Sequence, residues 1–189
     1  MSKKPLVVNL YGGPGCGKST GAAHIFSELK KKGVNAELIT EFAKDKTWEK
    51  NSVALNCQEY VFGKQSFRLQ RCRDDVDVIV TDSPLPLTII YNKNPALGQP
   101  FEQVVLSVFN TYNNINYLLK RVKPYNPKGR KQTESESIEI DGEVLNLLNK
   151  FNIVFFGVPG DDDGYNFIVD EVYDYLKHNN LLNKPVEEI

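Results

Sequence analysis

The 189-residue sequence is poor in the residues that build disulfide frameworks and metal clusters. It has only three cysteines, Cys16, Cys57 and Cys72, and no two of them have the C-x-x-C spacing of a zinc or redox site. We therefore expect reduced thiols, as in a cytoplasmic protein, and no fold held by disulfides. The only two histidines, His24 and His178, have no sequence neighbours that indicate catalysis or metal binding.

The sequence also lacks a strong net charge and a long apolar run. Its 23 Lys and Arg residues against 24 Asp and Glu residues leave a net charge of −1, which argues against a protein that coats nucleic acid through overall charge. No apolar run approaches the ~20 residues that span a membrane, and residues 1–5 lead directly into an apolar segment without the pattern of a secretory signal. We expect a cytoplasmic protein with no membrane segment.

A glycine-rich motif stands out near the start of the chain. Residues 12–19, GGPGCGKS, match the spacing G-x-x-x-x-G-K-[ST] at every fixed position. The apolar residues 6–11 predict a strand before the motif, and the pattern after it predicts a helix over about 17–32. In this strand–loop–helix setting the glycines let backbone N–H groups surround phosphate oxygens, and the helix N-terminus adds its positive dipole. The motif therefore predicts a phosphate-binding loop.

The individual residues of the motif have expected roles at a nucleotide. Lys18 is expected to reach the β- and γ-phosphates, and the Ser19 hydroxyl is expected to bind Mg²⁺. The residues expected to bind the nucleotide are Gly13, Pro14, Gly15, Cys16, Gly17, Lys18, Ser19 and Thr20. ATP and Mg²⁺ are therefore the expected cofactors.

The rest of the chain alternates between apolar strand patterns and helical patterns. Strands are expected at 34–40, 76–82, 115–119 and 152–158, and helices at 52–73, 87–91, 101–110, 138–148 and 165–178. Segments 42–51 and 92–100 are expected to be loops. Ser52, and either Ser135 or Ser137, are the expected N-caps of the helices that follow them. This alternation predicts one α/β domain over residues 1–189, a P-loop NTPase fold with a five-stranded parallel sheet flanked by helices.

Two acidic residues follow predicted strands, where ligands bind in parallel sheets. Asp82 ends an apolar strand, at the position where a P-loop enzyme holds Mg²⁺. Glu41 ends another strand and is the better candidate for a base that accepts a proton from an acceptor hydroxyl. The two roles are open to exchange or sharing. The structural alternatives are a turn residue or N-cap for Asp82 and a surface partner of Lys44 for Glu41.

A basic segment follows the fourth predicted strand. Residues 120–131 contain six cations, and we expect a short lid over about 120–134. An arginine that closes from a mobile loop can stabilise the charge on a transferring phosphoryl group, and Arg121 and Arg130 are the candidates. The alternatives are a solvated loop balanced by nearby glutamates, or a surface that holds the phosphates of a DNA acceptor.

The predicted helix over 52–73 offers polar groups that suit a base edge. The side chains concerned are those of Asn56, Gln58, Tyr60, Gln65 and Arg68. Phe62 or Trp48 is a candidate for stacking on an aromatic ring. Plain helix surface and core packing are the alternatives for this set.

Four sequence segments together resemble the small P-loop kinases. They are GGPGCGKST, TEFAKDKTWE, VDVIVTDSPL and KPYNPKGRKQ, which begin at residues 12, 40, 76 and 123. The group that they resemble is the ATPase/kinase family that includes nicotinamide riboside kinase domains and bacteriophage-encoded P-loop kinases, some of which phosphorylate 5-hydroxymethyluracil in DNA. The resemblance spans about residues 5–175.

The resemblance implies Mg-ATP as donor and a hydroxyl group as acceptor. It implies Lys18 and Ser19 at the nucleotide, Asp82 on the metal side, Glu41 near the acceptor and Arg130 in the lid. The predicted function is transfer of the γ-phosphate to a nucleoside, a nucleotide or a hydroxymethylated pyrimidine, either free or in DNA, in the cytoplasm or, for a phage protein, the host cytoplasm.

Two alternatives come from other functional classes. One is a regulatory P-loop NTPase whose only phosphoryl acceptor is water, and the other is a nucleic-acid-binding module that uses ATP only as a ligand. A GTPase is disfavoured because the residues from Asp82 to Leu85 do not form a D-x-x-G switch.

Overall fold

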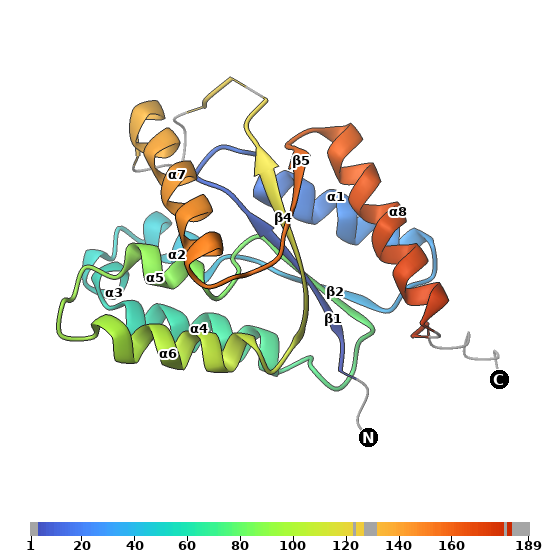
Figure 1. The fold of residues 1–189 in the computed structure, drawn as a ribbon, viewed down its shortest axis with the longest axis horizontal. Coiled ribbons are helices and arrows are strands. Elements are labelled where there is room, and N and C mark those ends of the chain that lie inside the picture. The colour runs from blue at the N-terminus through green and yellow to red at the C-terminus, as the bar shows by residue number, and fades with distance from the viewer. Residues whose placement is uncertain (1–3, 123, 127–131, 180, 183–189) are drawn as a thin grey trace.

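The computed structural model of the chain describes residues 4–122, 124–126, 132–179 and 181–182. Five strands form one sheet in this part of the chain: β1 (Leu6–Tyr11), β2 (Ala36–Ile39), β3 (Val78–Thr81), β4 (Asn113–Lys120) and β5 (Phe156–Pro159). The strand order is β2-β3-β1-β4-β5, and every neighbouring pair is parallel. The predicted five-stranded parallel sheet is therefore confirmed (Figure 1).

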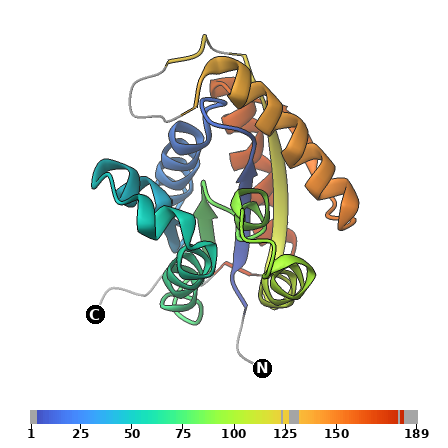
Figure 2. The ribbon, with the colours of Figure 1, turned by 90° about the vertical axis from the view of Figure 1, so that its left-hand side faces the viewer.

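Helices cover both faces of the sheet. They are α1 (Lys18–Lys31), α2 (Phe42–Trp48), α3 (Ser52–Asn56), α4 (Gln58–Gln70), α5 (Leu87–Tyr91), α6 (Gly98–Phe109), α7 (Glu134–Lys150) and α8 (Asp162–His178). Helices α1 and α8 pack together on one face, and α4 to α7 lie on the other, which Figure 2 turns toward the viewer. The flanking helices predicted from the alternating pattern are thus confirmed.

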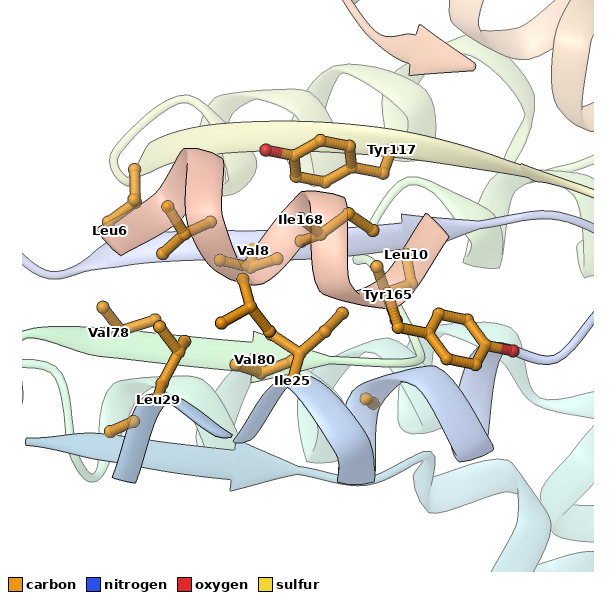
Figure 3. Packing of buried hydrophobic residues seen from close by; sticks show 14 of the residues in the cluster. Leu6, Val8, Leu10, Ile25, Leu29, Val78, Val80, Tyr117, Tyr165 and Ile168 are labelled. Carbon is orange, nitrogen blue, oxygen red and sulfur yellow. The ribbon is translucent and has the colours of Figure 1, made fainter. Parts of the chain in front are cut away.

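The core consists of two layers because side chains alternate across each strand. In β1, Leu6, Val8 and Leu10 face α1 and α8, where they pack with apolar residues such as Ile25 and Ile168 (Figure 3). Val7 faces the other side and packs with residues of α4 and α6. Every residue of β1 is buried, so this central strand holds the loop that follows it in a fixed position.

Three predictions for the segment before β3 differ from the structure: a loop, a helix and an N-cap. Segment 42–51 is not a loop, because residues 42–48 form α2, whose first backbone N–H, at Phe42, donates to Gln65 Oε1 at 2.9 Å. The single helix expected over 52–73 is divided into α3 and α4 at Cys57, which has a non-helical ψ of 83°. The side chain of Asn51, rather than that of Ser52, caps α3 by accepting from Ala54 N–H.

Three boundaries in the second half also differ from the predictions. Helix α6 begins at Gly98, inside the predicted loop 92–100. The N-cap of α7 is Thr133 rather than Ser135 or Ser137, and it forms a capping box with Glu136. Strand β5 begins at Phe156, four residues later than predicted. Among the described residues, no helix is long and apolar enough to cross a membrane.

Candidate functional site

The glycine-rich loop joins β1 to α1 at the carboxyl edge of the sheet. Gly12, Gly15 and Gly17 have φ angles of 138°, 85° and 99°, a region that other residues rarely adopt. A Cβ at Gly15 would approach Arg121 and Tyr125 to 3.1 Å, so the chain after β4 lies directly against the loop. The loop is therefore an enclosed turn whose shape depends on glycine.

A tyrosine of α8 supports the loop from behind. Tyr165 is fully buried, and its hydroxyl lies 2.8 Å from Gly160 O and 3.1 Å from Gly17 O. Burial raises the pKa of Tyr165 to about 12, so the hydroxyl remains a hydrogen-bond donor at neutral pH. Helix α8 thus holds Gly17, the N-cap residue immediately before α1, in place.

Lys18 is the first residue of α1, and its side chain turns back over the loop. Its Nζ donates to Gly12 O at 2.6 Å and to Gly13 O at 3.0 Å. Burial lowers the pKa of Lys18, but the acidic groups around it, which include Glu41 and Asp82, raise it more, so the pKa lies above its usual value. The ammonium group is therefore a fixed positive charge beside the loop.

Glu41 and Asp82 lie at the ends of neighbouring strands. β2 and β3 are paired in register with Ile39 opposite Thr81, so the next residues along both strands emerge at the same edge. Burial raises the pKa of Glu41, Lys18 lowers it and Asp82 raises it, with a net upward shift. Both carboxylates therefore lie close enough to Lys18 for their charges to act on its ammonium group.

A cavity of about 330 Å³ opens at this edge. Its lining side chains come from α1, from the end of β2, from α2 and from the end of β3: Ser19, Ala22, Ala23, Leu38, Thr40, Glu41, Lys44, Asp45, Trp48 and Asp82. Ser19 thus lines the same cavity as the two carboxylates. The volume lies within the range of small-molecule sites, about 300–1,000 Å³.

Ser19 and Asp82 fit the requirements of a magnesium ion that is bound together with phosphates. Asp82 is 4% exposed, and within the described residues its Oδ1 has no hydrogen-bond partner. The described residues include no group of three His, Cys, Asp or Glu side chains that could hold a metal alone. Mg²⁺ typically keeps several waters and uses one or two protein ligands plus substrate phosphates, so one hydroxyl and one carboxylate suffice.

Only one of the two predicted lid arginines, Arg121, lies within the described residues. Arg121 follows β4, and its Nε and one terminal nitrogen donate to Asp141 Oδ2 at 3.1 and 2.9 Å. Arg130 lies outside the described residues, as do residues 123, 127–129 and 131 of the predicted lid over 120–134. Arg121 therefore lies beside the phosphate-binding loop, and the roles of both arginines stay predictions.

Most of the polar groups expected along 52–73 are engaged within the protein. Gln65 binds the backbone at Phe42 and Thr40, Gln58 binds Leu55 O, and Arg68 pairs with Asp45. Phe62 is 9% exposed and packs edge-to-face on Phe101 in the core, so it is not a stacking surface. Trp48 is 68% exposed on the cavity wall and is the aromatic residue that is free to stack.

Three residues near the loop were missed by sequence analysis. Asp45 lines the cavity from α2, and Tyr91 of α5 lies close enough to Lys18 that, against the lowering effect of burial, it helps to raise the pKa of Lys18. Asp141 of α7 accepts a hydrogen bond from Gly13 N–H. Tyr91 and Asp141 belong to no local motif, and Asp45 lies in the segment 40–49 but was not singled out there; only the folded chain brings the three to the site.

A second cavity, of about 370 Å³, lies near the amino end of β4. Its lining residues are Phe109, Asn110, Tyr112, Asn114, Ile115, Asn116, Phe151, Asn152, Ile153, Val154 and Phe156, none of which is charged. The amide groups of Asn114 and Asn116 donate to backbone carbonyls within the protein. This cavity therefore lacks the charged groups that phosphate chemistry requires.

The fold and the loop define a P-loop nucleotide-binding domain. The chain belongs to the AAA domain family, whose match covers residues 7–163. The structure of a NadR protein in complex with NR is similar, with a TM-score of 0.64 and 15% identity over 90% of this chain and 51% of that chain. The structure of YorR protein from Bacillus subtilis, in complex with phosphorylated GDP, has a TM-score of 0.58 and 16% identity over 94% of this chain and 99% of that chain.

These similarities support the fold of a P-loop kinase. The chain spans about half the length of the NadR chain that it matches and nearly all of the YorR chain. No curated protein matches the chain significantly.

Proposed function

We propose that the protein is an ATP-dependent phosphotransferase that moves the γ-phosphate of ATP to a hydroxyl group of a nucleoside or nucleotide. The observation that carries the proposal is that Glu41 and Asp82 line one cavity together with Ser19 and lie close enough to Lys18 of the glycine-rich loop for their charges to act on its ammonium group. A protein that only binds a nucleotide has no need of a partly buried carboxylate with a raised pKa beside the loop lysine.

The donor side is formed by the loop and α1. Lys18 exchanges its contacts with Gly12 O and Gly13 O for phosphate oxygens and neutralises charge on the transferring group. Ser19 and Asp82 would hold Mg²⁺, which would supply positive charge against the negative charge of the transferring phosphoryl group. The buried, unpartnered oxygen of Asp82 supports this role.

The acceptor side is formed by Glu41 and α2. Glu41 accepts the proton of the acceptor hydroxyl as that oxygen attacks the γ-phosphate, and a pKa raised by burial brings the carboxylate closer to the working pH of a base. Trp48 provides a flat apolar surface for a base or another aromatic ring, and Lys44 adds a positive charge. A nucleoside or nucleotide combines a hydroxyl with such a ring, and a hydroxymethylated pyrimidine, free or in DNA, has the same two features.

The test is to follow labelled γ-phosphate. Purified protein is incubated with γ-labelled ATP, Mg²⁺ and separate panels of nucleosides, nucleotides, nicotinamide riboside and hydroxymethylated DNA. We expect label in one acceptor class with wild-type protein and none with Lys18→Ala. If label appears only in inorganic phosphate, the protein is a regulatory NTPase and the proposal is wrong. If label appears in no product, the protein is a module that only binds the nucleotide, and the proposal is also wrong.

A further inference from the structure

Asp141 links the phosphate-binding loop to the arginine that follows β4. Its Oδ1 accepts from Gly13 N–H at 2.6 Å, and its Oδ2 accepts from Arg121 Nε at 3.1 Å and from one terminal nitrogen at 2.9 Å. One carboxylate therefore binds two segments that are 128 and 20 residues away from it in sequence. Because Asp141 is a residue of α7, this contact places α7 directly against the phosphate-binding loop.

The bridge is tightly packed. The side chains of Arg121 and Asp141 are 14% and 29% exposed. A Cβ at Gly13 would lie within 2.6 Å of Asp141 Oδ1 and would also clash with Ser137 O, one helical turn earlier on α7. Glycine at position 13 is thus what lets α7 approach the loop. Two charge-assisted hydrogen bonds from one guanidinium to the same oxygen, Asp141 Oδ2, restrict the orientation of the Arg121 side chain.

The third nitrogen of the Arg121 guanidinium makes no hydrogen bond to Asp141. This atom, Nη1, is buried, and in the part of the chain that the structure describes it has no hydrogen-bond partner. It lies next to the loop, 3.1 Å from where a Cβ on Gly15 would be. A buried, charged donor without a partner costs free energy, and at this position an anion bound by the loop would satisfy it.

We propose that Asp141 is a positioning residue: by binding Gly13 N–H and two nitrogens of Arg121 together, it aims the remaining nitrogen of Arg121 at the phosphates of the bound nucleotide. An effect of Asp141 on phosphoryl transfer rests on the proposed function. An effect of Asp141 on nucleotide binding does not, because binding of the nucleotide requires no acceptor. Helix α7, which carries Asp141, begins at Glu134 with a capping box between Thr133 and Glu136.

The direct test is Asp141→Asn. The variant keeps an acceptor for Gly13 N–H but removes the charge that orients Arg121. We expect affinity for ADP and ATP to fall about tenfold, measured by titration calorimetry, with a further loss in the rate of transfer. Arg121→Ala should weaken binding at least as much, and the double variant should be no worse than Arg121→Ala, because the carboxylate acts only through the guanidinium. Glu139→Gln, an exposed change on the same helix, is the matched control and should leave binding unchanged.

Two outcomes would overturn the proposal. One is wild-type nucleotide affinity in Asp141→Asn, and the other is full additivity of the two losses in the double variant, which a purely structural role for Asp141 would give. If Asp141→Asn does not fold, Arg121→Lys is the variant to test. A single ammonium group cannot make two hydrogen bonds to Asp141 and still reach the loop, so its nucleotide affinity should also fall. Wild-type affinity in Arg121→Lys would refute the proposal. Nucleotide binding that depends on Asp141 in a protein without transfer activity would disprove the proposed function alone.

Discussion

Replacing Glu41 with Gln removes one charge from the cavity and keeps the size of the side chain. Burial and Asp82 raise the pKa of Glu41, while Lys18 lowers it, and the net shift is upward. The folded protein therefore binds the Glu41 proton more tightly than the unfolded chain does. The stability that this group contributes is fully present below its unfolded pKa, about 4.3, and is lost as the pH rises through the folded value.

The stability of Glu41→Gln should consequently differ from that of wild type in a pH-dependent way. At pH 7–8 the ligand-free variant should melt at a higher temperature than wild type, because it has no buried charge to accommodate. The difference should shrink as the pH falls toward 4, where Glu41 of the wild type is protonated. Melting curves between pH 4 and pH 9 measure this, with Glu59→Gln, an exposed change on α4, as control.

The same change should slow the chemistry. Loss of a general base costs about 10²-fold or more, which corresponds to about 2.7 kcal/mol of transition-state free energy. Single-turnover transfer from labelled ATP should show this loss while ATP affinity stays nearly unchanged. In wild type, activity should fall as the pH drops through the raised pKa of Glu41, and the variant should lack that decline. An unchanged transfer rate would remove Glu41 from the mechanism, and a lower melting temperature at pH 7–8 would refute the electrostatic reasoning.

Three further changes test other parts of the site. Asp82→Asn should raise the Mg²⁺ concentration for half-maximal activity about tenfold or more, because a carboxylate is the stronger ligand, and equal midpoints in a Mg²⁺ titration would argue against a metal role. Tyr165→Phe leaves Gly160 O without its donor and should lower the free energy of unfolding by about 1–2 kcal/mol. For a chain of this size that is a fall of about 2–8 °C in melting temperature, and an unchanged melting temperature would contradict the supporting role of the hydroxyl. Trp48→Ala should raise the KM for the acceptor about tenfold with no change in the KM for ATP, and equal effects on both would rule out a specific stacking surface.

The parts of the fold that sequence predicted are those with a strong local signal. The phosphate-binding loop is a continuous motif between an apolar strand and an amphipathic helix, and its glycines have the positive φ angles that the turn requires. The ends of α3, α4 and β5 were misplaced because long-range packing decides them. Residues 152–155 are as apolar as a strand, but strand pairing with β4 begins only at Phe156, opposite Tyr117.

The residues of the candidate site also fall into those that the sequence could predict and those that it could not. Glu41 and Asp82 were found because the ends of neighbouring parallel strands meet at one edge, which follows from topology alone. Asp141 could not be found, because its contact with Gly13 joins residues 128 positions apart and depends on how α7 crosses the loop. Phe62 was a wrong candidate for stacking, since the helical period alone did not show that this side of α4 packs against Phe101 of α6 in the core.

The central claim is that one triphosphate is held by the loop with its γ-phosphate between Lys18, Asp82 and Glu41. A crystal structure with Mg²⁺ and a non-hydrolysable ATP analogue tests it most directly. The account predicts Lys18 Nζ on the γ-phosphate, the metal bound by Ser19 with Asp82 beside it, and Glu41 facing the γ-phosphate from the acceptor side. A triphosphate bound away from the loop, or a γ-phosphate that Glu41 cannot face, would contradict it.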